Sequence, residues 1–359
     1  MQVQVQEGLT RPLFLSNKPT ERMKTKYIII LLAVVAVAAT AFLSEQYYHY
    51  AYCNFVARDT LSHTYEVYPD MSLESVLHRM EQDYRVQSEL SWDLVCKVKE
   101  FATPKAGRYT FAAAISNREL VRRLQLGEQT PVRLSFTHAI RTPEQLAAHL
   151  GERLLLDSAE IVGLLRDKAV WTMFLPNTYE VWWTVSPEQL ISRMQREYEA
   201  FWTAERQAKA KAKGLTPYEV QVLASIVASE TNRRDEHPLI ASLYLNRLRK
   251  GIPLQACPTV IYAHGLNDPQ MFKTRRVLKR HLAYDSPYNT YKYRGLPPTP
   301  IRLTRPDVLD AVLNAPKTDY LYMCANPDFS GTHVFSSSYA KHSATARQYQ
   351  RELNQRKIK

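Results

Sequence analysis

Glu230, in the stretch VLASIVASETN (222–232), is a carboxylic acid on an otherwise apolar helix face. At about 100° per residue, Leu223, Ile226, Val227 and Glu230 form one stripe, with Glu230 roughly 20° from Leu223. Burying an ionised carboxylate is costly, so such a group is expected to stay protonated near neutral pH, as a general acid must. The alternative is that Glu230, near the end of its helix, simply emerges into solvent, and spacing alone favours this alternative.

The other acids near Glu230 have structural explanations. Glu219 follows Thr216 at the spacing of a capping box, which predicts the start of this helix rather than a reactive group. Asp235 and Glu236 lie in a polar loop beside two arginines, and we interpret them as members of surface ion pairs. The sequence therefore offers one strong candidate acid.

Metal and disulfide chemistry have little support. His333 and His342 do not have a recognised metal-ligand spacing, so we expect no metal site. Four cysteines could form two disulfides but lack C-x-x-C spacing, and unpaired buried residues are the favoured interpretation. They are Cys53, Cys96, Cys257 and Cys324.

The helix of Glu230 is flanked by elements that must position it. Apolar periodicity predicts one long helix over about 187–213 before it, and another after it that ends at Gly251. Residues 320–325 and 332–336 alternate as the two strands of a hairpin. These elements predict a larger mixed α/β domain over 131–352.

A smaller α+β module is predicted ahead of that domain, over 63–130. Its strands are expected near 65–68 and 108–111, and its helices near 73–80 and 117–126. The fold class is therefore α+β, with two folded parts of different size.

Tyr27–Leu43 is a run of 17 residues without a charge, at the short end of the roughly 17–25 residues that cross a bilayer. Basic residues precede the run, so the positive-inside rule predicts a cytoplasmic tail at 1–26 and a single transmembrane helix at 27–44. The remainder lies outside, beginning with a polar spacer at 45–62. A cleaved signal peptide is the alternative, but the long tail and long run favour the anchor.

The net charge is +12 over 359 residues, of which 45% are hydrophobic. This composition is typical of a folded protein of two or three domains. A basic chain suits an acidic partner: nucleic acid, an anionic membrane surface or an acidic wall polymer. Export of most of the chain argues against nucleic acid.

Four motifs occur in this order: ASIVASETN, LYLNRLRKGIPLQACPTVIYA, SPYNTYKYRGLPPTPI and HVFSSSYAKH. Together they resemble the YceG-like endolytic murein transglycosylases (MltG type), over about residues 63–352. The small domain of that family is LysM-like, and AGRYTFAAAISNRELVRRLQLGE, from Ala106, is similar to it. Glu230 matches the family's catalytic glutamate, and Ala228 stands where many relatives have a second acid.

The resemblance implies an enzyme that cleaves the bond between N-acetylmuramic acid and N-acetylglucosamine within nascent peptidoglycan strands, leaving 1,6-anhydro ends and terminating elongation. It implies no cofactor, an inner-membrane location with an extracytoplasmic catalytic domain, and penicillin-binding synthases as possible partners. Gln255, Asn289 and Tyr291 match positions expected to bind the glycan, although loop capping and packing are the alternatives.

Two positions depart from the family pattern. Cys257 and Asn177 stand where relatives usually or often have aspartate. A reduced rate or redox sensitivity would follow if the Cys257 position normally holds a charge. The alternative function is therefore a catalytically impaired scaffold that binds peptidoglycan, and a cytoplasmic nucleic-acid binder is a third hypothesis.

Overall fold

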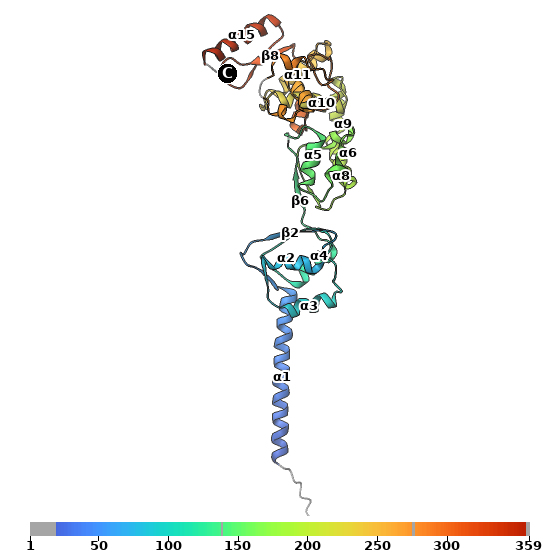
Figure 1. Cartoon of the computed structure of the whole chain (residues 1–359), viewed down its shortest axis with the longest axis vertical. Coiled ribbons are helices and arrows are strands. Elements are labelled where there is room, and N and C mark those ends of the chain that lie inside the picture. Colours follow the sequence, from blue (N-terminus) through green and yellow to red (C-terminus); the bar gives the residue numbers. More distant parts are fainter. Residues whose placement is uncertain (1–18, 138, 275–276, 357–359) are drawn as a thin grey trace, which may run out of the picture. The chain divides into compact units, whose positions relative to one another are not determined.

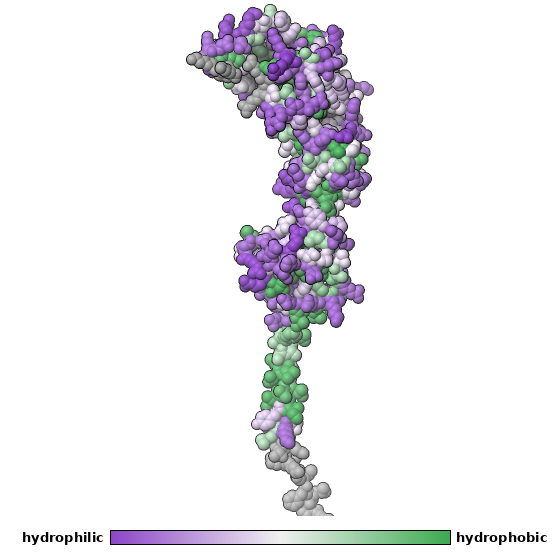
Figure 2. Space-filling model, in the orientation of Figure 1, coloured by the Kyte–Doolittle hydropathy of each residue, from purple (hydrophilic) through white to green (hydrophobic). Residues whose placement is uncertain are grey.

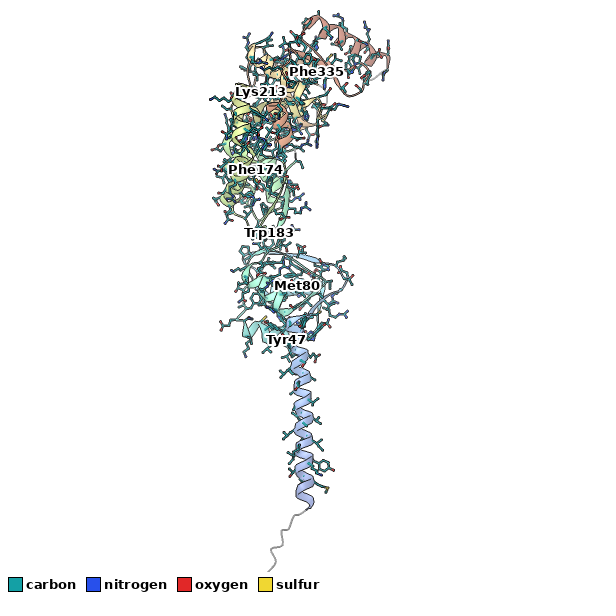
Figure 3. All side chains as sticks on the ribbon, turned by 180° about the vertical axis from the view of Figure 1, so that it is seen from behind. Tyr47, Met80, Phe174, Trp183, Lys213 and Phe335 are labelled. Carbon is teal, nitrogen blue, oxygen red and sulfur yellow. The ribbon has the colours of Figure 1, made fainter. Side chains whose placement is uncertain are left out.

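The computed structural model describes residues 19–137, 139–274 and 277–356, with side chains from Met23 onward. The chain divides into two compact units, and the division falls between Gln129 and Thr130. Each unit has its own core, marked by Met80 in the first and Phe174 in the second (Figure 3). Most of the expected tail, residues 1–18, lies outside the described part of the chain.

Helix α1 spans Pro19–Ala51 and projects from the first unit (Figure 1). Within it, Met23–Ala51 is long and apolar enough to cross a membrane, and its apolar side chains are exposed (Figure 2). A helix satisfies its own backbone hydrogen bonds, which is the condition for crossing a bilayer. This fits the expected single-pass anchor.

The structure differs from the polar spacer expected at 45–62. Helix α1 continues to Ala51, and Phe55–Ala57 form strand β1. Phe55 and Ala57 alternate inward with period 2 and are buried, so this stretch belongs to the folded unit despite its polar composition. Strand β1 lies between β3 (Tyr84–Val86) and β5 (Ala114–Ile115) and is antiparallel to both.

The rest of the first unit combines a two-stranded sheet with three helices. Strand β2 (His63–Val67) pairs with β4 (Gly107–Phe111), with Tyr65 opposite Tyr109. The helices are α2 (Leu73–Glu81), α3 (Glu89–Val98) and α4 (Asn117–Leu126). The expected mixture of helix and sheet is confirmed.

The second unit begins with antiparallel strands and short helices around one apolar core. Strand β6 (Val132–Ser135) pairs with β7 (Thr178–Val181). The helices here are α5 (Pro143–Gly151), α6 (Ser158–Leu165), α7 (Lys168–Met173), α8 (Pro187–Phe201) and α9 (Ala204–Ala212).

The single helix expected over 187–213 is wrong, because it is broken after Phe201. Trp202 leaves helical geometry, and the Thr203 side chain accepts a hydrogen bond from Arg206 N at the start of α9. A threonine that caps a new helix offers the backbone an alternative to continuing the old one.

Helix α10 (Pro217–Glu230) is the centre of the remaining core. Its residues from Val220 to Val227 are all buried, as expected for a helix with neighbours on every side. It packs against α11 (His237–Arg249), α12 (Cys257–Gly265) and α14 (Pro306–Leu313). The other elements are η1 (Pro269–Lys273), α13 (Lys279–Leu282), β8 (Tyr322–Ala325), β9 (His333–Ser336) and α15 (Tyr339–Gln355).

Candidate active site

Helix α10 places Glu230 at its C-terminal end. A capping box fixes the other end: the Thr216 hydroxyl accepts from Glu219 N, and the Glu219 carboxylate accepts from Thr216 N. Glu230 is the last residue of the helix, and Thr231 after it is extended. The buried middle of the helix thus holds Glu230 rigidly at the edge of the core.

A pocket of about 400 Å³ opens beside this helix end. It is formed by α10, α11, the start of α12, the loop carrying Tyr291, the β8–β9 hairpin and α15. The lining residues are Glu230, Leu243, Tyr244, Arg247, Leu254, Gln255, Cys257, Tyr291, Met323, Cys324, Ala325, His333 and His342. Among the described residues that line the pocket, Glu230 supplies the single carboxyl group.

Glu230 has the two properties that a general acid needs, a raised pKa and a position facing a pocket. Burial raises the pKa of its carboxyl group, and two neighbours oppose this in part: the Tyr244 hydroxyl and the charge of His333 lower the pKa. The Tyr244 hydroxyl donates to Glu230 Oε1 at 2.6 Å. The sequence offered two interpretations, a buried acid and an acid that emerges into solvent. Each was incomplete, because Glu230 is desolvated and yet faces a pocket.

The structure corrects the interpretation of Glu236 as a surface ion-pair residue. Glu236 is 5% exposed, and its carboxylate accepts from the backbone N of His333 at 2.6 Å. Its other oxygen, Oε2, accepts a hydrogen bond from Nδ1 of His333 at 2.9 Å. Asp235 does pair with Arg233 at the surface, as expected.

His333 is the residue that sequence reasoning missed. The Nδ1 atom of His333 donates a hydrogen bond to Glu236. The other ring nitrogen, Nε2, has no hydrogen-bond partner among the described residues, and His333 lines the pocket. A buried carboxylate that bonds an imidazole in this way fixes the direction of the ring. Little in the sequence indicated this pair, because Glu236 and His333 lie 97 positions apart in the chain.

Arg247 and Gln255 form one side of the pocket. Arg247 is buried and donates to the carbonyl oxygens of Leu321, Pro253 and Leu254, as well as to Gln255 Oε1 at 3.2 Å. Gln255 has a φ of 53°, in the left-handed region that side chains other than glycine rarely adopt. Backbone strain of this kind is typical of functional sites.

Tyr291 and Cys257 face each other on another side. The thiol and the Tyr291 hydroxyl share a hydrogen bond at 3.2 Å. Burial raises the pKa of both groups, so both are neutral at neutral pH. Cys257 thus contributes a neutral thiol to the pocket lining.

Asn289 lies outside the pocket lining. It is fully buried, and its amide donates to the carbonyl oxygens of Leu282 and Tyr284 while its own oxygen accepts from Tyr291 N. The structure therefore brings together Glu230, Gln255 and Tyr291 but places Asn289 behind them. Asn177 is also outside the lining, where its side chain accepts from Thr178 N.

His342 adds a second imidazole to the pocket. Its Nδ1 is buried without a hydrogen-bond partner among the described residues, and burial together with the charge of Arg247 lowers its pKa. Within residues 19–137, 139–274 and 277–356, no three histidine, cysteine, aspartate or glutamate side chains are grouped as ligands for a metal ion. All four cysteines are free.

The sequence matches the family model described as "YceG-like family" over residues 65–348. The endolytic murein transglycosylase of Bacillus subtilis is 33% identical over 171 residues, covering 48% of this chain and 45% of the relative. The protein of the same name from Streptococcus pneumoniae serotype 2 is 26% identical over 283 residues, covering 69% of this chain and 51% of the relative. The chain spans about half the length of these curated relatives.

Among solved structures, a YceG-like protein of Listeria monocytogenes is similar to this chain. The TM-score is 0.53 at 25% sequence identity, and the match covers 79% of this chain and 98% of the other.

Proposed function

The chain belongs to the YceG-like family, and on that premise we propose that it is a membrane-anchored endolytic murein transglycosylase. Its substrate is the glycan strand of peptidoglycan, cut between N-acetylmuramic acid and N-acetylglucosamine. Two curated relatives bear this activity in their names.

One observation carries the proposal: Glu230 is a desolvated carboxylic acid on the wall of a pocket whose described lining holds no second carboxyl group. Hydrolytic glycosidases generally use two carboxyl groups, one as acid and one as base or nucleophile. A transglycosylase that closes a ring on its own substrate needs only one. The neutral thiol of Cys257 leaves Glu230 as that one group.

Glu230 first acts as the acid. Its carboxyl proton passes to the glycosidic oxygen, the bond from C1 of N-acetylmuramic acid to that oxygen breaks, and the electron pair leaves with the oxygen. The resulting centre at C1 has oxocarbenium character and lies beside the carboxylate that has just formed, which stabilises it electrostatically.

Glu230 then acts as the base. Its carboxylate takes the proton of the C6 hydroxyl of the same sugar, the C6 oxygen bonds to C1, and the 1,6-anhydro ring closes. Glu230 is again protonated, and no water or cofactor is consumed. The Tyr244 hydroxyl donates a hydrogen bond to Oε1 of Glu230 and so stabilises the carboxylate between the two steps.

The pocket offers hydrogen-bonding groups for the glycan from several elements. His342 and His333, whose Nε2 has no partner among the described residues, line the same pocket as Gln255 and Tyr291. We assign these four residues to binding sugar hydroxyl and acetamido groups. Asn289 is a positioning residue that holds the backbone of Tyr291.

The first unit and α1 complete the proposal. We assign the first unit as the LysM-like module of the family, with α1 crossing the inner membrane, its N-terminus cytoplasmic and the catalytic unit outside. Cleavage of new strands there terminates their elongation, near the penicillin-binding synthases that make them. The apolar length of α1 and the family membership support this arrangement.

The test is digestion of peptidoglycan by the purified chain, with mass spectrometry of the product ends. Glu230→Gln keeps the shape of the side chain and removes its acidity, so we expect a loss of turnover on the order of 10²–10⁴-fold. Glu219→Gln is the matched control, because glutamine also completes a capping box on the same helix. Glycan binding without cleavage by the unaltered chain would instead favour the scaffold.

A further inference from the structure

Helix α3 carries an exposed apolar stripe in addition to its buried face. Leu90, Leu94 and Val98 are 56%, 53% and 69% exposed and lie one turn apart. The side of α3 that faces the core is formed by other residues, Trp92 and Val95, which are buried. Three large exposed apolar residues in a row on one short helix indicate a surface that is covered by something.

The first turn of α3 is joined to the end of the apolar part of α1. The Ser88 and Ser91 hydroxyls donate to the side chain and backbone carbonyl oxygens of Gln46, at 3.0 and 3.2 Å. Gln46 is three residues beyond Leu43, the last residue of the apolar run, which is a rise of about 4.5 Å along the helix. Figure 1 shows α3 at the end of the unit from which α1 emerges.

The stripe lies on a different side of α3 from the acids of this helix. With 3.6 residues per turn, Val98, Leu94 and Leu90 are roughly 20°, 60° and 100° around the helix from Ser91, which contacts α1. The acids Glu89 and Asp93 are each about 160° from Ser91, on the far side. The exposed apolar side chains and the acids therefore occupy separate faces of a helix whose first turn contacts the end of α1.

The surroundings have the character of a membrane interface. Tyr47, Tyr48 and Tyr52, at the end of α1, are exposed, as in the aromatic belts that flank membrane spans. Tyr47 is labelled where α1 meets the folded module (Figure 3).

A basic pocket lies in the same region. Its volume is about 220 Å³, and Tyr50 of α1, Lys99 and two arginines of α4, Arg118 and Arg122, are among its lining residues. Arg122 pairs with Glu128 at 3.1 Å, whereas Lys99 and Arg118 have no ion-pair partner in the described part of the chain.

We propose that this surface, formed by the end of α1, α3 and the basic pocket, docks on an anionic phospholipid bilayer. Leu90, Leu94 and Val98 enter the boundary between headgroups and acyl chains, as the apolar face of an interfacial helix does. Lys99 and Arg118 bind lipid phosphate groups at the headgroup level. This proposal depends on α1 crossing the membrane, as proposed above, and does not depend on the reaction at Glu230.

The test places an environment-sensitive fluorophore on single cysteines of the full chain, after replacement of the four native cysteines. The chain is reconstituted in phosphatidylglycerol–phosphatidylethanolamine vesicles that contain a lipid with a quencher high in its acyl chain. Positions 94 and 93 are a matched pair, adjacent on α3 and exposed but on different faces; position 36, within α1, reports the membrane span. We expect quenching at 94 to be several times that at 93, with strong quenching at 36.

Quenching at 36 with equal, weak signals at 94 and 93 would overturn the docking surface while leaving the anchor intact. Absence of quenching at 36 would overturn both the anchor and the surface. In vesicles of phosphatidylcholine alone, or with Lys99→Gln and Arg118→Gln together, we expect the signal at 94 to fall. An unchanged signal in both cases would overturn the role of the basic pocket.

Discussion

Burial raises the pKa of Glu230, and two neighbours that the local sequence does not contain oppose this in part. Its helix supplies the desolvation, but the bond from Tyr244 and the charge of His333 come from other elements. Periodicity along α10 left two interpretations of Glu230 open, and the resemblance carried by ASIVASETN was the reason to predict it as the catalytic acid. They could not predict the Glu236–His333 pair, because that contact depends on how the hairpin folds back over the loop before α11.

Tyr244→Phe should shift the pH dependence of activity upward. The Tyr244 hydroxyl donates to the Glu230 carboxylate and so lowers a pKa that burial raises. Without it the pKa of Glu230 rises further, and the protonated acid persists to higher pH. The basic limb of kcat/KM against pH reports this change.

Tyr218→Phe is the matched control for that experiment, since it removes a tyrosine bond to the Pro298 carbonyl away from the pocket. Its basic limb should coincide with that of the unaltered chain. A Tyr244→Phe profile that stays in place, or moves to lower pH, would contradict the assignment of Glu230 as the titrating acid.

Glu230→Gln should stabilise the protein increasingly as pH rises. A glutamate whose folded pKa is raised contributes stability below its unfolded pKa and loses it as pH rises through the folded pKa. Glutamine has no such loss, so the difference in Tm between variant and unaltered chain should grow with pH. A difference that is constant across pH, or that shrinks, would show that Glu230 is not desolvated in the folded state.

At the scale of elements, the connection between α11 and α12 holds Gln255 in a left-handed conformation. Gln255→Gly should relieve strain of about 1 kcal/mol and raise stability, while the loss of the amide lowers activity. Gln255→Ala is the matched comparison, because it removes the same amide and keeps the strain. Chemical denaturation and turnover of the two variants separate the effects; equal stabilities would mean that the backbone there is unstrained.

Element boundaries show where sequence reasoning ends. The capping box at Thr216 and the glycine after α11 were readable because they are local signals. Strand β1 was not, since a three-residue strand acquires its stability from β3 and β5, which lie 27 or more residues away in the chain. The apolar stripe used to predict one helix ends at Trp202, the C-cap of α8, and the cap at Thr203 that begins α9 was overlooked.

At the scale of the whole molecule, the folded part of the first unit includes the end of α1. A chain that begins at residue 63 lacks β1, the central strand of its sheet, as well as Gln46 and Tyr50 from α1. We expect it to lose protection of the first unit in limited proteolysis and hydrogen exchange. A chain that begins at residue 45 keeps these contacts and should be protected, and equal protection of the two would contradict the assigned role of β1.

The most direct test of a single-carboxyl transglycosylase is digestion of peptidoglycan in heavy-oxygen water. Because the C6 hydroxyl of the sugar closes the ring, the new ends released by the unaltered chain should be 1,6-anhydro ends that contain no solvent oxygen, and Glu230→Gln should release almost none. Reducing ends that carry the heavy isotope would contradict this account, because they would require an attacking water and a second group to activate it.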